Sequence, residues 1–162
     1  MKYTAINELE FFDFHHTYVK DISLSDSQMK WQVEFLKIPV NSTGNPLDKV
    51  TYFTGSAEIV FENVNIEKIS LPVLRHDHAY EPSEYEPVLK TWQELYRVTN
   101  LMKLDDVDCY KIRLTAFPKL SAPSGIYVLE MTFTHSIVTW DKFEKKSCYE
   151  NDEWVIKTIT NE

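Results

Sequence analysis

Polar and apolar residues alternate with period two along much of the chain. Residues 28–35 (Gln-Met-Lys-Trp-Gln-Val-Glu-Phe) follow this period without an error, which predicts a strand with one face in a core and the other in water. The segment 11–24 is rich in aromatic and β-branched residues. A Ser-Asp-Ser turn at 25–27 separates the two segments, so we expect a hairpin. Residues 56–62 and 109–116 alternate in the same way and predict further strands.

One segment departs from this period. Ser83 and Glu86 have the spacing of a capping box, and apolar side chains then recur at intervals of three and four. The spacing predicts an amphipathic helix over 83–103, which ends at the acidic stretch 104–108. The residues that this helix would pack against the sheet are Val88, Trp92, Leu95 and Tyr96.

The last third returns to strand patterns, with a long apolar run over 126–140 and a short strand over 154–159. Consecutive strands with short turns favour an antiparallel arrangement. The sequence therefore predicts a mainly β fold: an antiparallel sheet or sandwich of about eight strands with one amphipathic helix, in a single domain over 1–162. The predicted core contains Phe14, Trp31, Val33, Phe35, Ile59, Phe61, Ile112, Leu114, Met131, Phe133 and Trp140.

The charge balance narrows the possible partners. The chain has 25 acidic and 17 basic side chains, a formal net charge of −8, and no basic cluster longer than Lys145-Lys146. Nucleic acids and anionic membranes are bound through clustered Lys and Arg, so the sequence predicts binding to neither. A basic protein partner is compatible with this balance, as is plain solubility. The N-terminal residues lack the apolar core of a signal peptide, which predicts a cytoplasmic protein.

Motifs for catalysis are absent from the sequence. There is no Gly-x-Ser-x-Gly, and glycines at only 44, 55 and 125 cannot form a phosphate-binding loop. Cys109 and Cys148 have no Cys-x-x-Cys partner and lie in apolar-rich segments, which favours buried free thiols over one disulfide. The sequence thus favours a protein that is not an enzyme and needs no cofactor.

The histidines suggest a different hypothesis. His15 follows Asp13 by two residues, and His76 and His78 flank Asp77. Imidazole and carboxylate groups suit zinc or a similar metal ion. A metal-binding module or metal-dependent enzyme could therefore use His15, His76, Asp77 and His78. The alternative is that 75–78 forms a polar surface loop.

Aromatic and acidic residues alternate near the start of the predicted helix. Tyr80 and Tyr85 stand beside Glu81, Glu84 and Glu86, and such a mixed segment is typical of a protein-interaction surface. A solvated helix entry is the alternative. Aromatic residues make up 14% of the whole chain, so an aromatic-lined cleft for a small ligand is a further possibility.

Three segments together resemble a known group of proteins. They are Phe12-Asp13-Phe14-His15, residues 59–64 (Ile-Val-Phe-Glu-Asn-Val), and residues 137–143 (Ile-Val-Thr-Trp-Asp-Lys-Phe) followed by Cys148-Tyr149. In this order they resemble small, acidic, β-rich bacterial proteins of unassigned function, some of which are grouped with immunity proteins of polymorphic toxin systems. The resemblance implies a stoichiometric binding role and no catalytic residues.

The leading hypothesis is a non-catalytic, cytoplasmic binding protein, immunity-like, whose acidic surface meets a basic protein partner. The expected partner-binding residues are Tyr80, Glu81, Glu84, Tyr85 and Glu86. The alternatives are the metal site and the small-ligand cleft.

Overall fold

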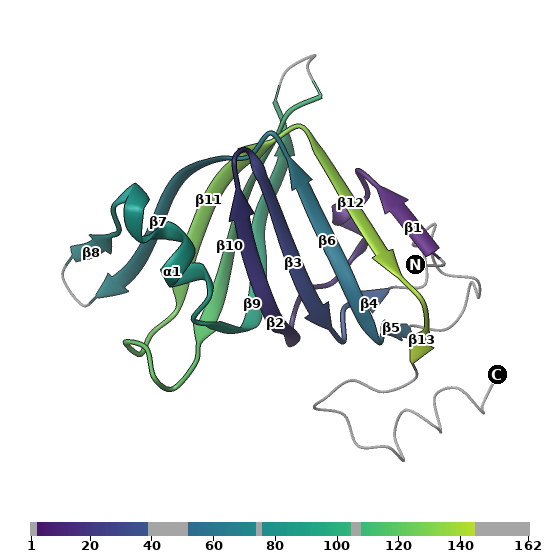
Figure 1. Ribbon diagram of the computed structural model, residues 1–162, viewed down its shortest axis with the longest axis horizontal. Helices are drawn as coiled ribbons and strands as arrows, with labels where there is room; N and C mark the ends of the chain where they lie inside the picture. The colour runs from purple at the N-terminus through teal and green to yellow at the C-terminus, as the bar shows by residue number, and fades with distance from the viewer. Residues whose placement is uncertain (1–2, 39–51, 74–75, 105–107, 145–162) are drawn as a thin grey trace.

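The computed structural model describes residues 3–38, 52–73, 76–104 and 108–144 (Figure 1). Within these residues the chain is mainly antiparallel β-structure, as predicted. The predicted strand over 154–159 and Cys148 lie outside the described residues. The strands are β1 (Tyr3–Ile6), β2 (Thr17–Ser25), β3 (Gln28–Glu34), β4 (Lys37–Ile38), β5 (Tyr52–Thr54), β6 (Ser56–Glu62), β7 (Asn65–Val73), β8 (His76–Ala79), β9 (Trp92–Lys103), β10 (Tyr110–Pro118), β11 (Tyr127–Phe133), β12 (His135–Trp140) and β13 (Phe143–Glu144). The helical elements are the 3-10 turns η1 (Leu9–Phe11) and η2 (Pro82–Glu84) and the short helix α1 (Tyr85–Leu89).

Ten of these strands form one sheet, in the order β1-β12-β6-β3-β2-β9-β10-β11-β7-β8. Strands β13, β5 and β4 form a small second sheet. The edge strands β8 and β1 of the large sheet lie at the left and right of Figure 1. The described part of the chain thus holds more strands than the eight expected. One reason is that the apolar run over 126–140 is two strands, β11 and β12. No helix within the described residues is long and apolar enough to cross a membrane.

The large sheet curves so that its two halves pack face to face. Phe61 on β6 and Phe133 on β11 are separated by four strands in the sheet order, yet their ring centroids are 5.0 Å apart. Trp31 on β3 likewise packs against Trp92 at the start of β9, with centroids 6.3 Å apart. One half is β1-β12-β6-β3-β2 and the other is β9-β10-β11-β7-β8. We call them the first and second halves.

The halves join through a short ladder that we call the seam. Strand β2 pairs with β9 only at Thr17↔Leu95 and Tyr18↔Glu94. The backbone N–H of His16 also donates to the carbonyl of Leu95 at 3.1 Å. Beyond Leu95 no strand of the described chain pairs with this edge of β9, since β2 begins only at Thr17.

The first half contains the predicted hairpin, which has one register shift, between Val19 and Asp21. Strands β2 and β3 form that hairpin, with Asp26 at φ 51° in its turn, although β2 begins at Thr17 and not at residue 11. The β3–β6 ladder runs from Met29↔Phe61 to Glu34↔Ser56 without a register shift. Such regular pairing keeps every second side chain in the core, which is why the period-two pattern was easy to interpret.

The helix predicted over 83–103 is wrong beyond its first turns. Only Tyr85–Leu89 is α-helical, and 92–103 is the strand β9. Nine of its twelve residues pair with the nine of β10, and the other three are the extra residues of β-bulges at three register shifts. Each bulge lengthens the period from two to three. Core-facing residues therefore recur at a helix-like spacing: Trp92, Leu95, Val98 and Leu101.

The helix start lies close to its predicted position but uses a different cap. The N–H of Glu81 donates to the Glu84 carboxylate at 2.8 Å, so the capping box lies two residues before the predicted one. Pro87 falls in the first turn of α1, where its missing N–H is tolerated. The buried side chain of Leu89 anchors the helix to the core.

The predicted core is confirmed except at one position. Phe35 is half-buried and lies edge-on to the ring of Tyr18. Its φ of 60° ends the strand at Glu34, so the alternation does not carry its side chain inward. The buried members of the predicted set are Phe14, Trp31, Val33, Ile59, Phe61, Ile112, Leu114, Met131, Phe133 and Trp140.

Candidate functional site

Two hollows in the described surface each hold residues that the sequence singled out. The first lies beside α1 and has a volume of about 300 Å³. We call it and its rim the α1 surface. The residues that line the hollow are Tyr80, Ser83, Glu84, Pro87, Val88, Thr91, Pro123 and Tyr127.

The α1 surface exists because the β10–β11 loop folds back toward the helix. The N–H of Lys119 donates to the carbonyl of Thr91 at 2.6 Å, which holds the start of this loop beside the end of α1. The Tyr127 hydroxyl donates to the carbonyl of Pro123 at 2.9 Å and fixes its end. Loop and helix therefore form one continuous surface.

Tyr127 forms the buried wall of this hollow. Its side chain is buried, and the ring of Tyr80 lies 6.0 Å away. Burial, together with the neighbouring Tyr80 hydroxyl, raises the pKa of Tyr127 to about 12. The hydroxyl therefore keeps its proton at neutral pH and remains the donor to Pro123.

Exposed apolar side chains occur on the β10–β11 loop, which supplies Pro123 to the hollow. Leu120 is fully exposed at the tip of the 119–122 turn, and Ile126 is also exposed. Single exposed apolar residues are common, but Leu120 lies three residues before Pro123 and Ile126 directly precedes Tyr127, and both Pro123 and Tyr127 line the hollow. One loop thus carries exposed apolar side chains and part of the lining of the hollow.

Carboxylates border the same surface on the helix side. Glu81 and Glu84 are exposed, and Glu86 is half-buried. Of the lysines nearby, Lys90 pairs with Asp21 at 3.2 Å, and Lys119 donates to the carbonyl of Lys90 at 3.4 Å. The rim is acidic along η2 and basic only at the end of α1.

The hollow contains only part of the predicted partner-binding set. Tyr80 and Glu84 line it, and the exposed Glu81 follows Tyr80 in the chain. Tyr85 and Glu86 are half-buried and do not line it, and Tyr85 packs against the core. Sequence reasoning missed the contribution of the loop: Leu120, Pro123 and Tyr127. Leu120 was detectable only as an apolar residue within a polar Pro- and Ser-rich loop.

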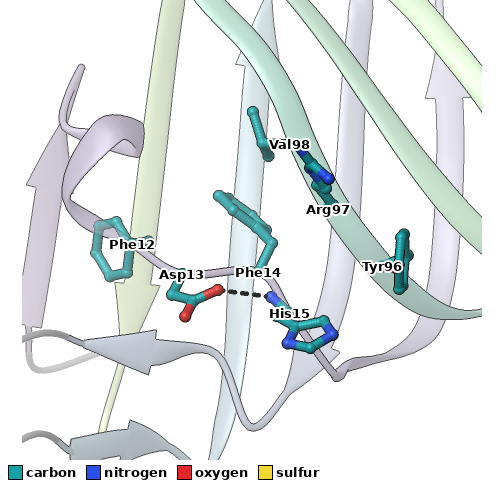
Figure 2. Close-up of a pocket in the computed structure, with 7 residues that line it drawn as sticks. All are labelled: Phe12, Asp13, Phe14, His15, Tyr96, Arg97 and Val98. Carbon is teal, nitrogen blue, oxygen red and sulfur yellow. Dashed lines mark hydrogen bonds between the residues drawn. The ribbon is translucent and has the colours of Figure 1, made fainter.

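The second hollow, the seam pocket, opens where β2 and β9 stop pairing. It has a volume of about 410 Å³ (Figure 2). Residues 12–15 form one side, and Tyr96, Arg97 and Val98 of β9 form the other. A backbone bridge between Asp13 and Lys37 draws 12–15 toward β4 and away from β9, which leaves the opening.

Some polar side chains of the seam pocket already form hydrogen bonds or ion pairs within the described part of the chain, and others do not. The Asp13 carboxylate accepts the N–H of His15 at 2.9 Å, and its other oxygen lies 3.8 Å from the Lys37 ammonium. The His15 ring stacks on His16 at 3.7 Å, and His16 Nδ1 lies 2.6 Å from a Glu94 carboxylate oxygen. Arg97 is exposed, and no described carboxylate forms an ion pair with it.

The predicted metal ligands lie in two separate places. His15 belongs to the seam pocket, whereas His76, Asp77 and His78 belong to the edge strand β8, and β9, β10, β11 and β7 stand between β2 and β8 in the sheet order. Asp77 pairs with Lys68 at 3.4 Å, and the ring of His78 lies edge-on to Tyr80. Among the described residues, no three His, Cys, Asp or Glu side chains are grouped closely enough to hold a metal ion. The structure thus does not assemble the predicted cluster.

Comparison with protein-family models, with curated proteins and with solved structures found no match to this chain. Function is therefore inferred from the two hollows and their chemistry.

Proposed function

We propose that this protein is a non-catalytic binding protein that docks a basic protein partner on the α1 surface. The observation that carries the proposal is an apolar hollow that Glu84 lines, with the exposed Glu81 next to Tyr80 in the chain and the fully exposed Leu120 on the loop that supplies Pro123. Protein interfaces combine such an apolar centre with a polar rim, and aromatic residues are enriched in them.

Charge complementarity supports a basic partner over an acidic or neutral one. The chain carries a net charge of −8, and the exposed Glu81 and Glu84 lie along η2. Lys90, the nearest cation on α1, is paired with Asp21. A partner with an apolar side chain for the hollow and Lys or Arg around it would fit both features, and long-range attraction would speed its approach.

The more specific part of the proposal concerns the setting. The resemblance to immunity proteins supports a stoichiometric role in a bacterial cytoplasm, in which the protein would bind a basic toxin domain. Stoichiometric binding of this kind needs no catalytic residue.

The test compares matched variants of the full chain. Leu120→Asp removes the exposed apolar group, and Glu81→Gln with Glu84→Gln removes two charges while it keeps their acceptor oxygens. The matched controls are Met102→Asp, another exposed apolar residue, and Glu10→Gln, an exposed acid on η1. Proteins captured from a lysate of the source organism at low salt are identified, and the candidate partner is purified.

Binding of the purified partner is then measured by calorimetry for each variant. We expect the captured partner to be basic. Leu120→Asp should bind it at least about tenfold more weakly, a loss of about 1.4 kcal/mol of binding free energy, and Met102→Asp should bind it as the wild type does. We also expect affinity to fall with added salt, less steeply for the double Gln variant than for Glu10→Gln. An empty eluate, a partner without basic character, or equal loss in the control variants would contradict the proposal.

A further inference from the structure

The seam pocket has the size and lining of a small-molecule site. Its volume of about 410 Å³ lies in the range of ligand-binding pockets, about 300–1,000 Å³. Phe12 and Phe14 are buried and, together with Val98, form an apolar wall of the pocket. Polar groups stand on both sides of the opening (Figure 2). Because it shares no lining residue with the α1 surface, the two sites can be tested separately.

The charge of a ligand that the seam pocket would bind depends on which polar side chains of the pocket already have partners. Asp13 already accepts the His15 N–H and lies near the Lys37 ammonium, so its charge is partly balanced. The carboxylate of Glu94 is engaged with His16. Arg97 lines the pocket and forms no ion pair with a carboxylate of the described chain. The charge left to be matched is therefore positive.

The local backbone explains why Arg97 stands at this opening. The bulge at Tyr96 shifts the register of β9, so Leu95 and Val98 face the core and Arg97 lies opposite Thr115. The ring of Tyr96 packs edge-on against Phe117 and His15, with centroids 5.3 and 5.6 Å away. These contacts hold the backbone on both sides of the pocket without closing it.

We propose that the seam pocket binds a small carboxylate that carries an apolar or aromatic body. A guanidinium presents a planar fork of N–H groups that matches a carboxylate in two parallel hydrogen bonds. Phe12, Phe14 and Val98 would contact the body of the ligand, and the rings of His15 and Tyr96 would border it. A bare phosphate would use only Arg97 and would leave the apolar wall uncovered.

Benzoate is a suitable probe because it joins a carboxylate to one ring. Its binding is measured by backbone amide shifts in NMR titration of the full chain. Inorganic phosphate tests the charge without the ring, and benzylamine tests the ring with the opposite charge. We expect benzoate to shift the amides of 12–15 and 96–98 with a Kd near ~1 mM, and both other probes to bind at least about tenfold more weakly.

Arg97→Gln supplies the residue-specific arm of the test. Arg113→Gln is its matched control, because Arg113 is also exposed on the second half but pairs with Glu130 at 3.4 Å. Arg97→Gln should weaken benzoate at least about tenfold and leave the fold intact, while Arg113→Gln should bind as the wild type does. The proposal would be overturned by equal benzoate affinity in the two variants, or by amide shifts confined to residues away from the seam. Tighter binding of benzylamine or phosphate, or no binding of benzoate, would overturn it as well. None of these results depends on whether the α1 surface binds a protein.

Discussion

Strands β3 and β9 show how differently the two halves of one sheet are built. Strand β3 pairs with β6 over six residue pairs with no register shift, and Met29, Trp31 and Val33 all point into the core. Strand β9 reaches the core with Trp92, Leu95, Val98 and Leu101 only because it has three bulges. The regular strand supports the core, whereas the seam pocket lies at the bulged one and the α1 surface lies beside its start. The strand with the most register shifts among the described ladders thus borders the seam pocket and begins beside the α1 surface.

The largest expected effect is in the regular half. Trp31 is completely buried and packs against Phe61 and Trp92. We expect Trp31→Ala to lower the free energy of unfolding by about 3–5 kcal/mol, measured by urea denaturation. Trp31→Phe should lower the free energy of unfolding less, because an aromatic ring remains in the core. The indole N–H that this substitution removes has no hydrogen-bond partner among the described residues. An unchanged urea midpoint for Trp31→Ala would show that Trp31 does not stabilise the core.

A neighbouring pair on β9 tests the bulges directly. Leu95 is buried, whereas Tyr96 is the extra residue of a bulge and is half-buried. Leu95→Ala should destabilise the fold by about 2–5 kcal/mol, and Tyr96→Ala should cost about 1 kcal/mol or less. Thermal and urea unfolding of the two variants measure the difference. Similar costs at both positions would favour the helical spacing, in which both side chains share one face.

A smaller effect is expected from alkali at the α1 surface. The pKa of Tyr127 is raised to about 12 in the fold, compared with about 10 in an unfolded chain. The folded state therefore holds this proton more tightly, and its contribution to stability is complete below pH 10 and is lost as the pH rises from 10 to 12.

Tyr127→Phe isolates this contribution. The difference in stability between the wild type and Tyr127→Phe should shrink across this pH range, as measured by urea unfolding at each pH. Ultraviolet titration should also lose its highest tyrosine ionisation in the variant. A stability difference that stays constant with pH would show that the hydroxyl of Tyr127 is not held as described.

Much of the fold could be predicted from alternation, and the failures have local causes. Alternation located β3, β6 and β10 because regular strands project every second side chain to one face. It failed at Phe35, where a positive φ turns the chain, and at β9, where bulges mimic helical spacing. Both depend on backbone geometry that the order of polar and apolar residues does not encode.

The candidate sites were only partly predictable for the same reason. Tyr80, Glu81 and Glu84 are close in sequence, so their grouping could be foreseen. Pro123 and Tyr127 reach the same hollow through the fold of the β10–β11 loop. His15 was noticed as a metal ligand, but its neighbours in the seam pocket include Arg97, more than eighty residues further along the chain. Long-range pairing brings such groups together, and one sequence does not reveal it.

If a basic partner binds at the α1 surface, it will slow amide exchange there and leave the regular strands unaffected. Hydrogen exchange of the purified complex measures this, because it reports protection along the chain. We expect slower exchange on binding within 80–91 and 119–127, and unchanged exchange in β3 and β6. Protection confined to the first half, with none beside α1, would contradict the proposed function.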